Sequence, residues 1–154
     1  MKDYRKAKLA KKNLKDMDLT DIDFRRADLS GVDLSRRTIR NSDFTSANLK
    51  GINLNGADLR ASNLRGADLS YADLRGANLA ESDLSGTNLH NADLNGANLS
   101  RTYIRGTDIR GVNFENVNLK DAIIKLIYDG EYKRVRTLVW LFFFFYLFFL
   151  FLIN

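Results

Sequence analysis

The 154-residue sequence contains no cysteine and no proline, and it has a single histidine. Without cysteine the chain forms no disulfide and no thiolate metal site. His90 stands between Leu89 and Asn91, which supply no metal ligands, so we expect it to be a solvated surface residue. The acidic residues are spread evenly along the chain, whereas a calcium site needs several oxygens at one point. We therefore expect no metal and no cofactor.

The sequence also lacks a sustained excess of one charge. The formal net charge is +5, but residues 1–15 hold seven basic residues against one acid, while residues 16–121 hold thirteen against sixteen. The positive excess lies near the ends, so the body offers neither a basic groove nor a dense negative surface. We expect no nucleic-acid partner. The lysine-rich beginning has no apolar segment of the secretory type, which predicts synthesis in the cytosol.

What the sequence has is a five-residue period. From Leu9 to Ile124 every fifth residue is leucine, isoleucine or phenylalanine. A small or apolar residue stands two places before it, and aspartate or asparagine stands between them, which gives the unit A-(D/N)-L-x-x. We number the places of this unit one to five, with leucine third. The leucines that we expect to form the core are Leu29, Leu49, Leu59, Leu64, Leu69, Leu74, Leu79, Leu84, Leu89, Leu94 and Leu99.

This unit resembles that of the pentapeptide repeat family. The resemblance implies an all-β solenoid, namely a right-handed quadrilateral β-helix in which four units make one coil and the first and third places point inward. We expect five to six coils over residues 16–126, with residues 1–15 as a basic segment that starts the solenoid. A narrow tube has room at each side for one large and one small side chain, which agrees with the observed pairing of leucine with alanine.

A coil of four units predicts a second period of twenty residues. Ser42, Ser62, Ser82 and Thr102 occupy the first place at this spacing, and Phe24 and Phe44 should stack in the third. Glycine is frequent in the fifth place, but one column lacks it. We expect that corner to use a different turn, because glycine marks backbone with φ above zero. The residues of that column are Asp21, Asn41, Ala61, Glu81, Arg101 and Asp121.

Three residues depart from the unit. Lys12 and Arg37 stand in the first place, where a small inward residue is expected, and Tyr103 replaces aspartate or asparagine in the second. Lys12 is interpreted as the frayed start of the solenoid. Arg37 raises the possibility of a bulge and of a change of register in the second coil.

No catalytic constellation emerges from the pattern. The serine column has no base beside it, so its hydroxyls are expected to bond to one another or to backbone. A tube filled with leucine and alanine leaves no pocket for a small-molecule substrate. We expect a protein that is not an enzyme.

Exposed arginines form two modest positive stripes. Arg25, Arg65 and Arg105 share one side of the coil, and Arg40 and Arg60 share another. We treat these five as a possible interaction surface; a simple solvated face is the alternative, because acids stand nearby.

Near the end of the sequence, seventeen residues from Thr137 to Ile153 carry no charge. At ~1.5 Å per helical residue they span about 25 Å, the short end of what a bilayer requires. We expect a single-pass transmembrane α-helix over 137–153, joined to the solenoid by a cap and joint at 127–136. The anchor residues would be Trp140, Phe142, Phe143, Phe144, Phe145, Phe148 and Phe149.

The charges beside this run predict its orientation. Lys133, Arg134 and Arg136 precede it, and flanking positive charge favours the cytoplasmic side. The expected protein is tail-anchored, with the repeat domain in the cytoplasm, and its partners are the lipid bilayer and a protein. Its expected function is that of a membrane-anchored interaction scaffold. The alternatives are a DNA-mimic, topoisomerase-binding protein, as some members of the family are, and an accessory subunit of a larger membrane complex.

Overall fold

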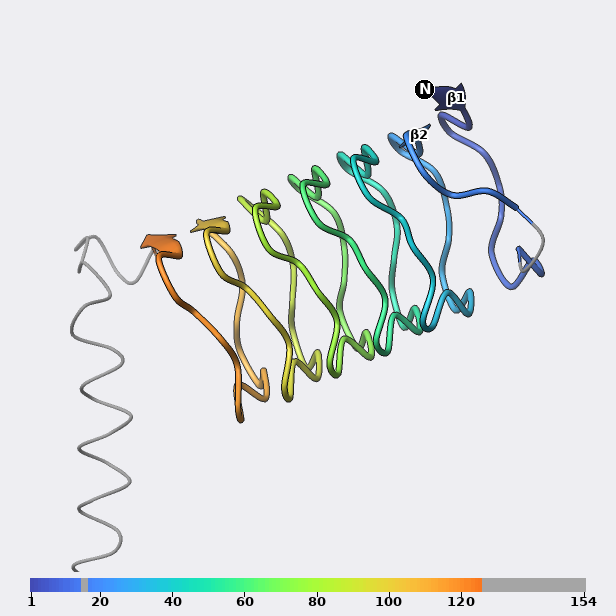
Figure 1. Ribbon diagram of the computed structural model, residues 1–154. Coiled ribbons are helices and arrows are strands. Elements are labelled where there is room, and N and C mark those ends of the chain that lie inside the picture. Colours follow the sequence, from blue (N-terminus) through green and yellow to red (C-terminus); the bar gives the residue numbers. More distant parts are fainter. Residues whose placement is uncertain (15–16, 126–154) are drawn as a thin grey trace, which may run out of the picture.

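The computed structural model describes residues 1–14 and 17–125, which form an all-β solenoid (Figure 1). The backbone repeats one path, so that successive coils stack along the rod. The named strands are short: β1 (Lys2–Asp3), β2 (Ile22–Asp23), β3 (Tyr103–Arg105) and β4 (Ile123–Lys125). β1 pairs with β2, and β3 pairs with β4, in parallel. Isolated parallel bridges link the coils between them.

Every bridge joins residues twenty positions apart. Along one side of the coil, six successive bridges lead from Asp3 through Asp23 to Ile123. We call this side face 1. The chain therefore makes six turns along this column, the upper value of the expected range. A constant offset of twenty residues is what four sides of five residues produce.

Backbone hydrogen bonds run from each unit to both neighbouring coils. The Asp58 N–H donates to the Arg37 carbonyl of the preceding coil at 2.8 Å. The Leu59 N–H donates to the Asn78 carbonyl of the following coil, also at 2.8 Å. The second and third places thus carry the ladder, so the coils are held together by the backbone as well as by the core.

The corners are tight turns with a left-handed residue in the fifth place. In one of them the Ala57 N–H donates to the Leu54 carbonyl at 2.9 Å, and Gly56 between them has φ of +62°. The column without glycine has the same backbone, since Ala61 has φ of +56° and Glu81 of +65°. The expectation of a different turn at that corner is wrong. The fifth-place residues of the described coils all have φ above zero, at a cost of ~1–2 kcal/mol where the residue is not glycine.

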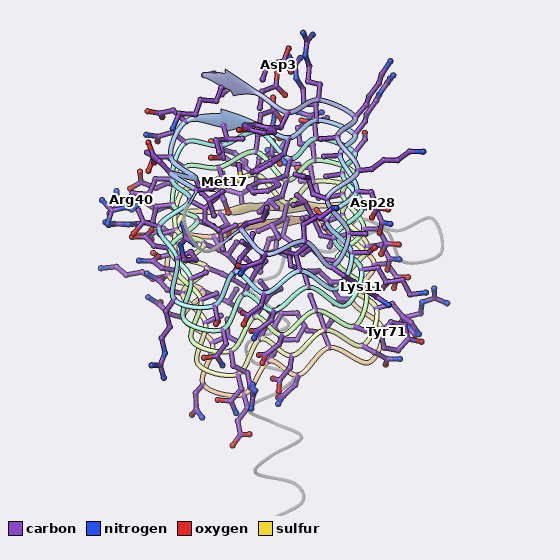
Figure 2. All side chains as sticks on the ribbon, turned by 90° about the vertical axis from the view of Figure 1, so that its right-hand side faces the viewer. Asp3, Lys11, Met17, Asp28, Arg40 and Tyr71 are labelled. Atoms are coloured by element: carbon purple, nitrogen blue, oxygen red, sulfur yellow. The ribbon has the colours of Figure 1, made fainter. Side chains whose placement is uncertain are left out.

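The inward third places form one continuous core. The leucines expected to form it are at most 1% exposed, and each such side chain contributes ~1.5–3 kcal/mol by leaving water. The Phe24 and Phe44 rings stack as expected, with centroids 5.3 Å apart, and Tyr4 extends the stack at 5.8 Å from Phe24. In an end-on view the outward side chains, among them Arg40 and Tyr71, radiate from the ribbon (Figure 2).

Buried hydroxyls in the first place bond to backbone carbonyls. Ser42 Oγ donates to the Leu19 carbonyl at 3.1 Å, and Ser62 Oγ donates to the Ile39 carbonyl at 3.0 Å. This confirms the expected backbone role of the serine column. Thr87, in the first place of a neighbouring column, also donates to a backbone carbonyl, that of Leu84, at 2.6 Å.

Arg37 keeps the twenty-residue register and forms no bulge. Thr38 beside it pairs with Asp58 in the regular way. The Arg37 guanidinium instead reaches back to the first coil and donates to the carbonyls of Leu14 (3.0 Å) and Met17. These carbonyls lie on either side of residues 15–16. An arginine in an inward place thus supplies hydrogen bonds at the start of the rod.

Within residues 1–14 and 17–125, no helix is long and apolar enough to cross a membrane. The expected joint and the expected transmembrane helix lie outside the described residues. The same holds for the expected anchor from Trp140 to Phe149 and for the charges at Lys133, Arg134 and Arg136.

Candidate functional site

The second place of the unit fixes the turn that follows it. Asp28 Oδ1 accepts the Ser30 N–H at 3.1 Å, and Asn63 Oδ1 accepts the Arg65 N–H at the same distance. Aspartate and asparagine favour such turns because their short side chains reach the backbone two residues on. This confirms the expected structural use of the acids. Side-chain groups that could hold a metal ion are absent from the described part of the chain.

Where the second place is aspartate and the fourth is arginine, the two side chains pair. Arg25 donates from Nε and Nη2 to the two oxygens of Asp23, at 2.9 and 2.6 Å. The hydrogen bonds from Arg25 lower the pKa of Asp23. In the same way Arg110 lowers the pKa of Asp108 to about 2. These pairs neutralise the surface locally, and each arginine makes its shortest contact within its own unit.

Arg40 and Arg65 have no acid in the second place of their own unit, and both turn to an acid of the next coil. Arg40 follows Thr38 and donates to Asp58 at 2.5 Å, where it shares the carboxylate with Arg60. The expected pair Arg40 and Arg60 is therefore brought together around one acid. Arg65 similarly lies 3.5 Å from Asp83.

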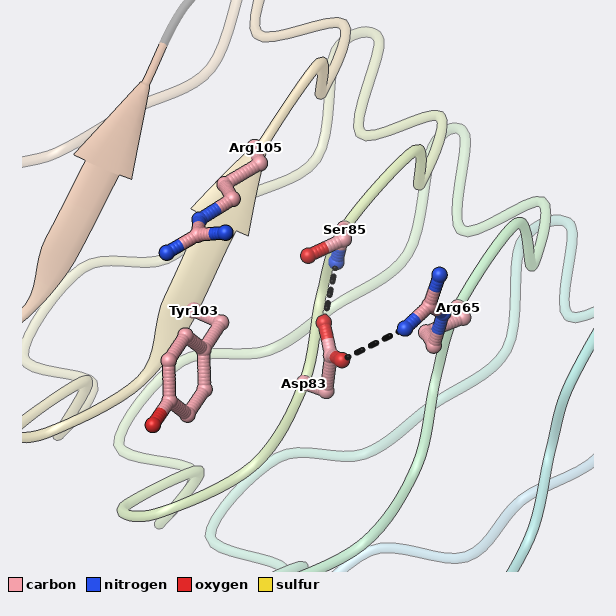
Figure 3. A pocket seen from close by; sticks show the side chains of 5 residues that line it. All are labelled: Arg65, Asp83, Ser85, Tyr103 and Arg105. Atoms are coloured by element: carbon pink, nitrogen blue, oxygen red, sulfur yellow. Dashed lines mark hydrogen bonds and ion pairs between the residues drawn. The ribbon is translucent and has the colours of Figure 1, made fainter.

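Face 1 contains a shallow depression between coils, lined by two of the arginines singled out in the sequence. Arg65 borders it on one side, Tyr103 and Arg105 of β3 border it on the other, and Asp83 and Ser85 of the coil between them lie in the middle (Figure 3). Arg25 lies on the same face but is bound to Asp23. The structure thus brings Arg65 and Arg105 to one open site and leaves Arg25 outside it.

Tyr103 gives this site an exposed aromatic ring. Its side chain stands in a place otherwise held mostly by aspartate and asparagine, and the residue is 42% exposed. The Arg105 guanidinium lies over the ring, 5.7 Å from its centroid. The sequence marked Tyr103 only as a departure from the pattern. It could have indicated a surface site, because a tyrosine in this place leaves Arg105 without the acid that pairs with arginine in other units.

A second aromatic group lies on the neighbouring face. Tyr71 is 55% exposed, Lys50 stands 5.7 Å from its ring centroid, and the His90 ring meets it edge-on at 5.8 Å. His90 is half-buried, its Nε2 lies 3.1 Å from Asn91 Nδ2, and its Nδ1 is buried. The expectation of a solvated histidine is wrong, because Tyr71 from the preceding coil packs against the ring.

The described chain is a tube filled with apolar side chains, and its exposed surface carries arginines that are mostly paired with carboxylates. Its chemistry suits contacts with another macromolecule across a face, since the depression is open and is lined by two arginines, one acid, one serine and one tyrosine. Such a tube belongs to the class of repeat solenoids, in which each unit packs against its neighbours.

The model of the family described as "Pentapeptide repeats" matches residues 5–36, 42–80 and 82–121, in eight copies. The chain belongs to the pentapeptide repeat family. The break in the match after residue 36 falls on Arg37 and Thr38, which depart from the unit.

Solved structures of the same family are similar to this chain. One is a pentapeptide repeat protein from the Arabidopsis thaliana thylakoid lumen, with 35% identity over 73% of this chain and 83% of that one, and a TM-score of 0.61. Another is HetL from Nostoc, a protein involved in the regulation of heterocyst differentiation. It shows 26% identity over 85% of this chain and 64% of that one, with a TM-score of 0.47. A comparison with curated proteins found no match.

Proposed function

We propose that this protein is an interaction scaffold held at a membrane, with the repeat rod in the cytoplasm. One observation carries the membrane part: the uncharged run from Thr137 to Ile153 follows a basic stretch that holds Lys133, Arg134 and Arg136. An apolar run of this length needs an apolar environment on every side. The outer surface of the described rod is charged and polar, and its core is already filled.

The rod itself supports a role in contacts between proteins. Six coil spacings of ~4.8 Å make a rigid element of about 29 Å with four faces. Its arginines are mostly paired with carboxylates of the same face, so the rod does not present the dense negative surface that a mimic of DNA requires. The depression on face 1 offers an open contact area of mixed chemistry.

The membrane part is tested by alkaline carbonate extraction of the full chain from cell membranes. We expect wild type to stay in the pellet and the double variant Phe144→Arg/Phe145→Arg to be released, because each central arginine costs ~2.5–3.5 kcal/mol on insertion. The control Phe144→Leu/Phe145→Leu should stay in the pellet. Release of wild type would contradict the membrane proposal.

The orientation is tested with protease on intact spheroplasts or sealed organelles. Protease added outside should spare the rod and should digest it only after permeabilisation. Digestion of the rod in sealed preparations would contradict the cytoplasmic placement, whatever the extraction shows.

A further inference from the structure

An arginine in the fourth place has two carboxylate positions within reach. The first is the second place of its own unit, two residues earlier. The other is the equivalent place of the next coil, eighteen residues later. Arg25 uses both, with Asp23 at 2.6 Å and Asp43 at 3.7 Å. Arg40 and Arg65 lack an acid in their own unit and use only the next coil.

Arg105 has a carboxylate at neither position. The place two residues earlier is Tyr103, and the place eighteen residues later is Ile123. The other arginines in the fourth place each have a carboxylate partner. These are Arg5, Arg25, Arg40, Arg60, Arg65, Arg75 and Arg110. Among the described residues, Arg105 is thus the one fourth-place arginine whose guanidinium is not paired with an acid.

The two residues that replace the acids are exposed and lie side by side. Tyr103 pairs with Ile123 in the β3–β4 register, and they are 42% and 44% exposed. They place aromatic and aliphatic surface beside the guanidinium, which already lies over the tyrosine ring. When a partner covers these exposed side chains and excludes water, the local dielectric falls and an arginine binds a carboxylate more strongly than in water.

We propose that Tyr103, Arg105 and Ile123, the Arg105 patch, bind an acidic segment of a partner protein in which a carboxylate is flanked by apolar side chains. The arginine accommodates the carboxylate with paired N–H donors, as arginine does in bidentate pairs. The flanking apolar side chains cover Tyr103 and Ile123. This proposal rests on the interaction role proposed above and does not depend on the membrane.

The depression that Tyr103 and Arg105 line favours a carboxylate over a phosphate polymer. Asp83 lies there with Arg65, so of the two arginines that line the depression only Arg105 is without a carboxylate. A nucleic acid needs many phosphate contacts to bind. A single carboxylate needs one arginine, which is what the Arg105 patch supplies.

The test measures binding of the full chain in detergent to fluorescent peptides that carry one glutamate between apolar residues, with glutamine-matched peptides as controls. We expect the glutamate peptides to bind, and Arg105→Gln to weaken binding by about tenfold or more, as the loss of a charge-assisted hydrogen bond does. Arg110→Gln is the matched control, since that arginine is already paired with Asp108. It should leave binding unchanged.

A second variant keeps the test independent of folding. Tyr103→Asp restores the repeat pattern and supplies Arg105 with a carboxylate in its own unit, so the rod should fold as well as before while peptide binding falls about as far as in Arg105→Gln. Circular dichroism melts check the folding.

Four results would overturn the proposal. The first is equal binding of glutamate and glutamine peptides, and the second is equal binding by wild type and Arg105→Gln. The third is a loss on Arg105→Gln of binding to anionic phosphatidylglycerol vesicles without any peptide binding, which would assign the patch to lipid. The fourth is peptide binding by the double variant Asp129→Asn/Glu131→Gln but not by wild type. It would mean that acids of the protein's own chain occupy the Arg105 patch. None of these results alters the carbonate extraction, so the two proposals fail separately.

Discussion

The middle of the solenoid and its ends follow the same repeat but differ in how completely their cores are closed. From Leu29 to Leu99 the third-place side chains are at most 1% exposed. Toward the ends, Leu9, Ile109 and Leu119 are only partly buried. A coil in the middle is covered by a coil on either side, whereas among the described residues the last coil has a neighbour on one side only. The last coil therefore closes its core less completely than the middle, although Leu14 and Leu19 of the first coil stay buried.

The ends are also where the sequence departs from the unit. Arg37 supplies hydrogen bonds to the first coil, and Tyr103 and Ile123 replace acids in the last ones. The middle tolerates few exceptions because each inward place is enclosed. Tyr103 lies on the exposed surface and Arg37 reaches the backbone of the first coil, so these departures serve purposes other than filling the tube.

The largest difference in unfolding free energy is expected between a core leucine of the middle and one of the end. Leu69→Ala should cost ~2–5 kcal/mol of unfolding free energy, because the tube cannot collapse around the void. Leu119→Ala should cost less, since that side chain is already partly in water. Arg65→Ala, on the surface, should stay within about 0.5 kcal/mol. Denaturant unfolding of the full chain in detergent measures all three, and equal losses would contradict the distinction between middle and end.

The next effect concerns the start of the rod. Arg37→Ala removes the donors that reach the Leu14 and Met17 carbonyls, and we expect a loss of ~1–3 kcal/mol. Arg36→Ala, at an exposed neighbouring site, is the control and should change little. Hydrogen exchange should show faster exchange in the first coil of the Arg37 variant and not in the middle. Uniformly faster exchange along the rod would mean that Arg37 does not act locally.

A smaller change, this time a gain in stability, is expected at the corner whose fifth-place residues include no glycine. Ala61 has φ of +56°, a conformation that costs ~1–2 kcal/mol for a residue with a Cβ. Ala61→Gly removes that cost but loses about 0.5–1 kcal/mol to the greater freedom of the unfolded glycine. We expect a net gain of roughly 0.5 kcal/mol, seen as a higher Tm. A lower Tm would show that the alanine methyl group contributes packing at this corner.

The smallest effect is the pH dependence of the stability that the surface pair Asp108 and Arg110 contributes near the end of the rod. Arg110 lowers the pKa of Asp108 to about 2, below the ~3.9 of an unfolded aspartate. Because the folded pKa is the lower one, the pair stabilises the rod above about pH 3.9 and loses this contribution as the pH falls through about 2.

The matched variant for this pair is Asp108→Asn, because asparagine can also close the turn. The Tm difference between wild type and this variant should be small at neutral pH, should shrink with added salt, and should vanish in acid. A difference that persists at low pH would have a cause other than the charge.

The sequence predicts most of the fold because one rule repeats. The inward leucines, the twenty-residue columns, the stacked Phe24 and Phe44 and the serine column all follow from the spacing and from close packing. The sequence predicts less about contacts between side chains of different coils and about the backbone conformation at the corners. The left-handed backbone at Ala61 and the packing of His90 against Tyr71 depend on the path of the neighbouring coil, which no local pattern contains.

The amino-acid sequence by itself determined the solenoid, because a five-residue period of large and small apolar residues fits only a narrow tube with a side of that length. It also gave the stripes of arginine, since residues twenty apart must share a face. The tertiary structure decided which arginines are paired. Whether Arg40, Arg65 or Arg105 meets a carboxylate depends on the residue that the next coil places beside it, so that Arg105, between Tyr103 and Ile123, stays without an acid partner among the described residues.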